Sequence, residues 1–153
     1  MGRHSRPGSH HRRQRTPREF PREGPALTPR ARWWGAVALW CALIFSLSSV
    51  PDRRTEAAPL PETLSRKAAH LVEYGVLAFL VLRALAAGGA GRKKALLGAF
   101  LFAVVFAASD EWHQTFVPGR YGKVRDVALD ALGAALALSV YARRSSLFPR
   151  EGK

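Results

Sequence analysis

Long apolar segments alternate with short polar ones along most of this chain. Residues 33–50 are 18 consecutive residues without a charged side chain, and residues 68–87, 95–108 and 127–141 are apolar with few interruptions. A helix of 18 residues is about 27 Å long, close to the thickness of the hydrocarbon core of a bilayer. The pattern therefore predicts an all-α protein, a four-helix transmembrane bundle over residues 33–144, with helices at about residues 33–50, 66–87, 93–116 and 124–142.

The first apolar segment also fits a cleaved signal peptide. A basic flank precedes it, and the small residues Ser46, Ser48 and Ser49 lie at its end. We favour a membrane helix, because the apolar run is long and the rest of the chain is also hydrophobic. Trp33 and Trp34 stand where an interfacial aromatic anchor is expected.

The N-terminal segment differs from the rest of the chain in composition. Residues 1–32 contain nine Arg and two acidic residues, with Pro, Gly, Ser and His between them. They show no apolar periodicity, so we predict a disordered Arg/Pro-rich tail, and residues 145–153 form a second basic tail. The excess of basic residues gives a net charge of +13 and hides the apolar segments in a mean hydropathy of -0.08. A basic tail beside a membrane helix favours anionic lipid as its partner over RNA, so no nucleic-acid partner is expected.

The distribution of basic residues predicts the orientation in the membrane. The N-terminal tail, the 88–94 turn and residues 143–153 together hold 16 Lys and Arg, whereas the 51–67 and 118–125 loops hold seven. The positive-inside rule therefore places both termini in the cytoplasm, and the protein in the inner (cytoplasmic) membrane as a multi-pass protein. The lipid bilayer is then its first partner. Cys41 is the only cysteine, which excludes an intrachain disulfide and a Cys-based zinc site.

This orientation brings the polar residues of three helices to the outer end of the bundle. At 1.5 Å per residue, their acidic residues lie about 5–8 Å inside the outer boundary. Spacings of three and four residues also place them on common helical faces. The candidate polar site consists of His70, Glu73 and Tyr74, of Asp110, Glu111, His113 and Gln114, of Arg120 in the following turn, and of Asp126 and Asp130.

Five acidic residues at this depth must be paired, hydrated or protonated, since each charge within a membrane helix costs roughly 2.5–3.5 kcal/mol. The candidate partners are the two histidines and the basic residues Arg66, Lys67, Arg120, Lys123 and Arg125. One interpretation is a functional pocket at the outer face. The other is a hydrogen-bonded network that joins the helices, and the sequence leaves both open.

Metal and catalytic chemistry have weaker support in the sequence. His70 and Glu73, joined by Asp110, Glu111 or His113, offer ligands for a divalent metal, but an HxxE spacing is not the HExxH zinc signature. We therefore predict no metal and no cofactor. His70 can also serve as a general base oriented by an acid, yet no Ser or Cys stands out as a nucleophile. The catalytic residues, if any, are unknown, and the pattern favours a protein without enzymatic activity.

Several motifs resemble those of the VanZ-like family, which consists of small multi-pass bacterial membrane proteins. The resemblance covers roughly residues 36–141 and rests on a DE-x-HQ-x-F-x-PGR run at 110–120, followed by D-x3-D-x2-G at 126–133. The segments 45–49 and 67–70 add to it. Ala137 stands where a further Gly is common, and the Arg-rich tail is not a family feature. The motif residues of this sequence are His70, Tyr74, Asp110, Glu111, Gln114, Arg120, Asp126 and Asp130.

The resemblance implies a role in the cell envelope. The founding member is associated with resistance to the glycopeptide teicoplanin, and the family gives its motif residues no agreed catalytic roles. We expect an outer-face polar site that meets an envelope molecule, such as a lipid-linked precursor or a glycopeptide. The alternative is a membrane-embedded enzyme that acts on a lipid or lipid-linked headgroup.

Overall fold

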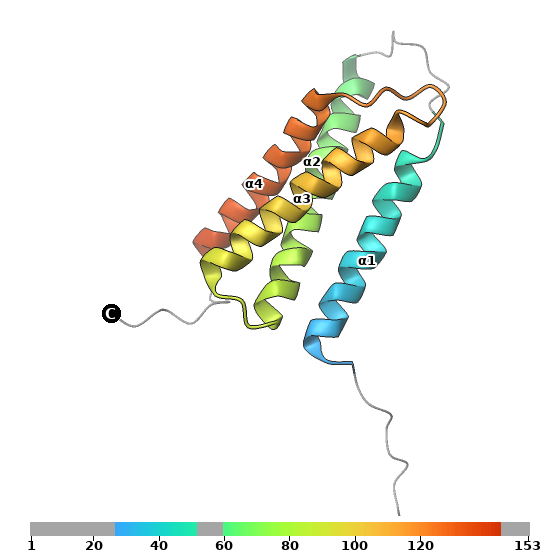
Figure 1. Cartoon of the computed structure of the whole chain (residues 1–153). Coiled ribbons are helices and arrows are strands. Elements are labelled where there is room, and N and C mark those ends of the chain that lie inside the picture. Colours follow the sequence, from blue (N-terminus) through green and yellow to red (C-terminus); the bar gives the residue numbers. More distant parts are fainter. Residues whose placement is uncertain (1–26, 52–59, 145–153) are drawn as a thin grey trace, which may run out of the picture.

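The computed structural model describes residues 27–51 and 60–144, and every regular element within them is an α-helix. The helices are α1 (Pro29–Ser48), α2 (Leu60–Ala87), α3 (Arg92–Gln114) and α4 (Val124–Arg144), and they run up and down as one bundle (Figure 1). The predicted all-α, four-helix architecture is confirmed. The predictions of disorder over residues 1–26 and of a basic tail at residues 145–153 concern segments outside the described residues.

Two helices begin earlier than their apolar segments predict. α1 starts at Pro29, so the last four residues of the predicted tail form its first turn. The side chain of Thr28 accepts a hydrogen bond from the backbone N–H of Ala31 at 3.2 Å, and proline suits the first helical position, because it has no N–H to leave unpaired. α2 starts at Leu60 instead of near residue 66. These starts precede the apolar segments, which by themselves locate only the buried or lipid-facing part of a helix.

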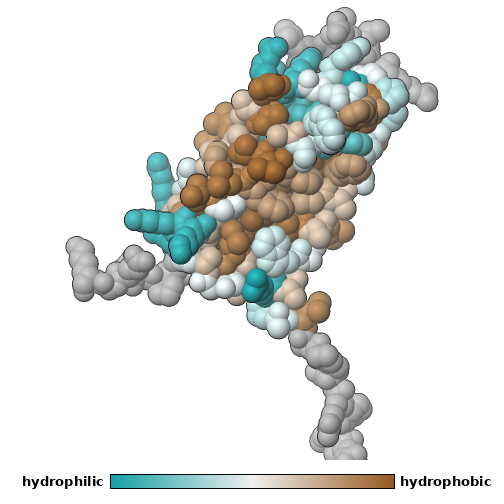
Figure 2. Space-filling model, in the orientation of Figure 1, coloured by the Kyte–Doolittle hydropathy of each residue, from teal (hydrophilic) through white to brown (hydrophobic). Residues whose placement is uncertain are grey.

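The surface of the bundle is apolar in its middle and polar toward its ends (Figure 2). Large side chains such as Leu39, Leu101 and Val105 are more than half exposed there. By length and composition, α1, residues Leu64–Ala87 of α2, and α3 can each cross a membrane. α4 is 21 residues long but carries five charged residues, so by length and composition it is not a clear membrane span. The chain is therefore a membrane protein with three clear candidate spans.

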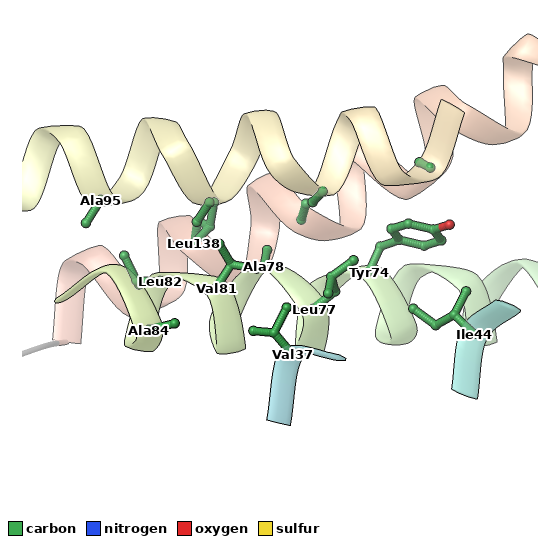
Figure 3. Packing of buried hydrophobic residues seen from close by; sticks show 14 residues of the cluster. Val37, Ile44, Tyr74, Leu77, Ala78, Val81, Leu82, Ala84, Ala95 and Leu138 are labelled. Atoms are coloured by element: carbon green, nitrogen blue, oxygen red, sulfur yellow. The ribbon is translucent and has the colours of Figure 1, made fainter. Parts of the chain in front are cut away.

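The helix α2 packs extensively against all three other helices, whereas α1 touches α3 much less. Buried residues of α2 recur at helical spacing, as at Tyr74, Leu77, Ala78 and Val81, and face both α1 and α4 (Figure 3). The buried face of α3 carries smaller side chains. It presents an alanine at every fourth position, namely Ala95, Ala99, Ala103 and Ala107. Small side chains let α3 lie close to its neighbours.

The helices α2 and α4 approach each other closely at Gly133. A Cβ atom at Gly133 would overlap the backbone carbonyl oxygen of Leu71 and lie 2.8 Å from its Cα atom. One turn along α2, a Cβ atom at Gly75 would meet Ala137 and the Gly133 carbonyl, each at 3.4 Å. The backbones thus meet where α4 carries no side chain, and this contact sets the position of α4 beside α2.

We predict that Gly133→Ala destabilises the protein. The added methyl group would meet backbone atoms of Leu71, which cannot move aside as a side chain can, so α2 and α4 must separate. Overpacking of this kind lowers the free energy of unfolding by about 1–3 kcal/mol. Gly35→Ala is the matched control, because Gly35 is also helical and has nothing within 4 Å of its Cβ position. Thermal unfolding in detergent should show a lower midpoint for Gly133→Ala only. Equal midpoints for the two variants would contradict the close α2–α4 packing.

Candidate functional site

The buried polar side chains of the described residues gather at one end of the bundle. At this end, here called the polar end, α1 and α3 finish and α2 and α4 begin. The buried polar and charged residues are Ser48, Asp110, Glu111, Gln114 and Asp130, each at most 6% exposed. On α3 they continue the alanine face, since Glu111 follows Ala107 by four residues. The same packing that buries the alanines therefore carries the acids into the bundle.

A hydrogen-bonded group joins α1 to α3 at the polar end. The hydroxyl of Ser48 donates to Oδ2 of Asp110 at 2.7 Å. The Nε2 amide of Gln114 donates to the same oxygen at 3.0 Å and to Oε1 of Glu111 at 3.3 Å. Asp110, Glu111 and Gln114 can meet because spacings of three and four residues share one helical face. Oδ1 of Asp110 has no hydrogen-bond partner in the described structure.

Arg120 binds the end of α1 rather than an acid. Its guanidinium donates to the carbonyls of Val50 and Leu47 at 3.0 and 3.1 Å, and to Oε1 of Gln114 at 3.3 Å. The last carbonyls of a helix lack intrahelical partners and carry partial negative charge, so a guanidinium there is favourable. The sequence offers Arg120 as a partner for the acidic residues. Among the described residues, Gln114 links it to Asp110 and Glu111.

A second group brings together one residue from each of α2, α3 and α4. Nδ1 of His70 lies 3.3 Å from Oδ1 of Asp130. Glu111 completes the group, and one nitrogen or oxygen from each of the three residues lies within 4.8 Å of the others. Glu111 is also held by the backbone N–H of Lys123, which donates to its Oε2 at 2.9 Å. Glu111 thus belongs to both groups.

Asp130 is the least satisfied residue at the polar end. It is 1% exposed, and neither carboxylate oxygen has a hydrogen-bond partner in the described structure. The hydroxyl of Tyr74 is likewise buried without a partner, and its ring points along the bundle toward the polar end (Figure 3). Buried polar groups almost always have partners, so these two mark an incomplete site.

Other candidate residues lie apart from the His70 group. His113 is 3.0 Å from the hydroxyl of Ser49 and stacks on Phe45, with ring centroids 4.1 Å apart. Glu73 contributes its backbone carbonyl, which accepts a hydrogen bond from the indole of Trp40 at 3.0 Å. Asp126 lies half-buried in the first turn of α4. The predicted polar residues therefore do not form one cluster. His70 lies beside Asp130, whereas His113 contacts Phe45 of the first helix and Ser49 at its end.

A hollow of about 470 Å³ opens between α1 and α3 at the polar end. Most of its wall is aromatic, and Asp110 is the buried acid that reaches it. Trp112 and Phe116 are each 68% exposed, so the mouth of the hollow lies on the outer surface of the bundle. The lining residues are Phe45, Phe106, Ser109, Asp110, Trp112, His113 and Phe116.

Ser48 belongs to the site but is not among the residues predicted for it, although it lies in the 45–49 segment that resembles the VanZ-like family. Its position follows from the buried face of α1, on which Val37, Ile44 and Ser48 are spaced by seven and four residues. Gly122 is a second omission. A side chain there would overlap the backbone of Glu111, so glycine allows the loop to bring the N–H of Lys123 to the Glu111 carboxylate.

We predict that Ser48→Ala lowers the free energy of unfolding by about 1–3 kcal/mol, because the variant removes a donor from the buried carboxylate of Asp110. Ser46→Ala is the control, since the exposed hydroxyl of Ser46 bonds only to the Ala42 carbonyl one turn earlier. Unfolding in detergent measures both. The loss should shrink in an Asp110→Ala background, because the two side chains form one interaction. Additive losses would exclude this coupling.

Comparison with known proteins places the chain in a family. The family model described as VanZ/LLP1 matches residues 7–146, which include all four helices and both polar groups. No curated protein and no solved structure matches the chain. The motif residues quoted from the sequence lie within the matched range, so the chain belongs to the VanZ/LLP1 family.

Proposed function

We propose that this membrane protein binds the headgroup of a lipid-linked envelope molecule at its polar end, on the outer side of the cytoplasmic membrane. The observation that carries the proposal is the position of Asp110. This buried carboxylate reaches an aromatic hollow that opens on the side of the bundle, and one of its oxygens has no partner in the described structure. Apolar walls around a few fixed polar groups are typical of small-molecule sites.

The two parts of the hollow suit the two parts of such a ligand. The rings of Phe45, Phe106 and Phe116 fit an apolar chain that arrives from the bilayer. The carboxylate of Asp110, which lines the hollow, fits a hydroxyl, amide or ammonium donor of the headgroup. A glycopeptide is the other ligand that the family suggests. A volume of about 470 Å³ favours a headgroup, because sites of this size enclose drug-sized molecules.

The proposal includes a fourth membrane span, formed by α4. Its 21 residues extend about 31 Å, enough to cross the hydrocarbon core. Four of its charged residues occupy its two ends, and the fifth, Asp130, is buried against α2 and α3. With α4 across the membrane, both termini are cytoplasmic and the polar end faces outward, as the distribution of basic residues favours.

An enzyme acting on a lipid headgroup is the second candidate, and the contact between His70 and Asp130 favours it. A buried carboxylate beside Nδ1 can orient an imidazole so that Nε2 acts as a base. His70 is 27% exposed, so its ring is accessible from the polar end. Release of a headgroup product from purified lipids, abolished in His70→Gln, would favour this candidate over binding alone.

We predict the topology from single cysteines in a Cys41→Ser background. Tyr121→Cys should react with an impermeant thiol reagent in intact cells, because Tyr121 is 67% exposed in the loop between α3 and α4. Gly91→Cys and Arg143→Cys should react only after the membrane is permeabilised. Gly91 tolerates a side chain, since its Cβ position has nothing within 4 Å.

Each position tests a separate part of the topology. Labelling of Arg143→Cys in intact cells, with Tyr121→Cys also labelled, would show that α4 does not cross. If Gly91→Cys reacted in intact cells and Tyr121→Cys did not, the orientation would be the reverse of the one proposed, with the polar end in the cytoplasm. Either result would overturn the corresponding part of the proposal.

We predict that Asp110→Asn loses the bound lipid. Asparagine keeps the size of the side chain and one acceptor oxygen for Ser48, but removes the carboxylate that accepts the headgroup donor. Mass spectrometry of lipids that co-purify with the protein should show a species enriched on the wild type and reduced at least about tenfold on Asp110→Asn. A tenfold loss corresponds to roughly 1.4 kcal/mol of binding free energy.

Ser46→Ala is the control for purification, because Ser46 lies on the exposed face of α1 away from Asp110. Its lipid profile should match that of the wild type. Thermal unfolding of Asp110→Asn establishes that the variant is folded. A folded Asp110→Asn protein with the wild-type lipid profile would refute the assignment of Asp110 to a ligand site and leave it a role in helix packing alone.

A further inference from the structure

The His70, Glu111 and Asp130 group has the composition of a metal site rather than of a simple ion pair. It offers one imidazole nitrogen and two carboxylates, and one donor atom from each lies within 4.8 Å of the others. Ligands at about 2.0–2.2 Å from a common ion are separated by roughly 3–4 Å. The His70–Asp130 separation of 3.3 Å already lies in this range. The third ligand, from Glu111, lies within 4.8 Å of the other two, so a small side-chain rotation would bring it to the same point.

Asp130 supplies an independent indication of a missing ligand. It is 99% buried, it points toward His70 and Glu111, and neither of its oxygens accepts a hydrogen bond from the described residues. Nδ1 of His70 is also buried without a hydrogen bond, although it lies near Oδ1 of Asp130. Donor atoms that converge without bonding one another are arranged as ligands are around an ion.

The negative charge of the buried carboxylates also favours a bound cation. Glu111 and Asp130 are buried beside a third acid, Asp110, on the same end of the bundle. The guanidinium of Arg120 is bound to the carbonyls of Leu47 and Val50, and Lys123 offers Glu111 its backbone N–H. Buried carboxylates without a counter-charge are costly. A single protonated His70 balances one of them, whereas a divalent ion balances two.

We propose that His70, Glu111 and Asp130 bind a divalent transition-metal ion of the Zn²⁺ type. The imidazole favours such metals over Mg²⁺ and Ca²⁺, which prefer oxygen ligands throughout. Three protein ligands leave a fourth position open, as in zinc sites that bind water or a substrate oxygen. Gln114 and the backbone of Lys123 hold the Glu111 carboxylate from behind. The site does not depend on the lipid ligand proposed above, because an ion can bind with water in the open position.

No sequence signature marks this site, because its ligands come from three helices. The sequence pairs His70 with Glu73 on one helical face and predicts no metal. In the structure Asp130 of α4 takes the place that Glu73 was expected to fill. The contact at Gly133 makes this possible, since it brings α4 against α2 next to His70.

Zinc binding to the purified full-length protein tests the proposal. His4, His10 and His11 are changed to Asn in every sample, because these tail histidines can bind zinc themselves, and any affinity tag is removed. After chelator treatment in detergent, titration with ZnCl₂ should show one equivalent bound and a rise in the thermal midpoint. Asp130→Asn, Glu111→Gln and His70→Gln should each weaken binding more than about 100-fold, since even the loss of an outer-shell partner costs 10–100-fold.

Asp126→Asn is the matched control, because Asp126 lies one turn from Asp130 on α4 but outside the group. It should bind zinc as the parent protein does. Co²⁺ gives a readout that does not depend on variants: the parent should show the intense visible bands of a four-coordinate nitrogen and oxygen site. Absence of stoichiometric zinc on the parent protein would overturn the proposal, as would equal binding by His70→Gln. A weak octahedral Co²⁺ spectrum would also overturn it.

Discussion

Three carboxyl groups, those of Asp110, Glu111 and Asp130, are buried inside one end of a bundle whose surface is apolar in its middle. Buried carboxyl groups need hydrogen-bond or charged partners, and the surrounding side chains supply some of them. Asp110 receives two hydrogen bonds, from Ser48 and Gln114, and Glu111 receives two, from Gln114 and the Lys123 backbone. Asp130 has His70 beside it and no hydrogen bond in the described structure. Asp130 of α4 thus has fewer hydrogen bonds than Asp110 and Glu111 of α3, although Oδ1 of Asp110 also has no partner in the described structure.

Packing of small residues creates this geometry. The alanine face of α3 and the glycine contact between α2 and α4 keep three helices close together along their length. A face that is alanine for four turns and then becomes Glu111 carries that acid into the bundle without a change in helix direction. Larger side chains at these positions would separate the helices and admit lipid or water between the acidic residues.

The helix α1 is held differently, through its two ends. At the polar end, Ser48 bonds to Asp110, and Arg120 binds the carbonyls of Leu47 in the last turn of α1 and of Val50 just after it. At the other end, Trp33 packs edge-on against Phe79, and the Arg83 guanidinium lies 4.5 Å above the Trp33 ring. Between these attachments α1 rests mainly on α2 and touches α3 little. This arrangement leaves room for the aromatic hollow beside Asp110.

The number of helices, their order and the helix on which each polar residue lies can be predicted from the sequence alone, because apolar runs and helical spacing are local properties of the chain. The sequence also identified nine residues of α2, α3 and α4 and the Arg120 turn as a polar set. Only the tertiary structure decided which of them meet. It joined His70 to Asp130 in place of Glu73, sent Arg120 to α1, and drew Ser48 into the site. The physical reason is that partner choice depends on the rotation and separation of packed helices, which are set by side-chain volume at contacts between helices that are distant in sequence, such as Gly133 of α4 against Leu71 of α2.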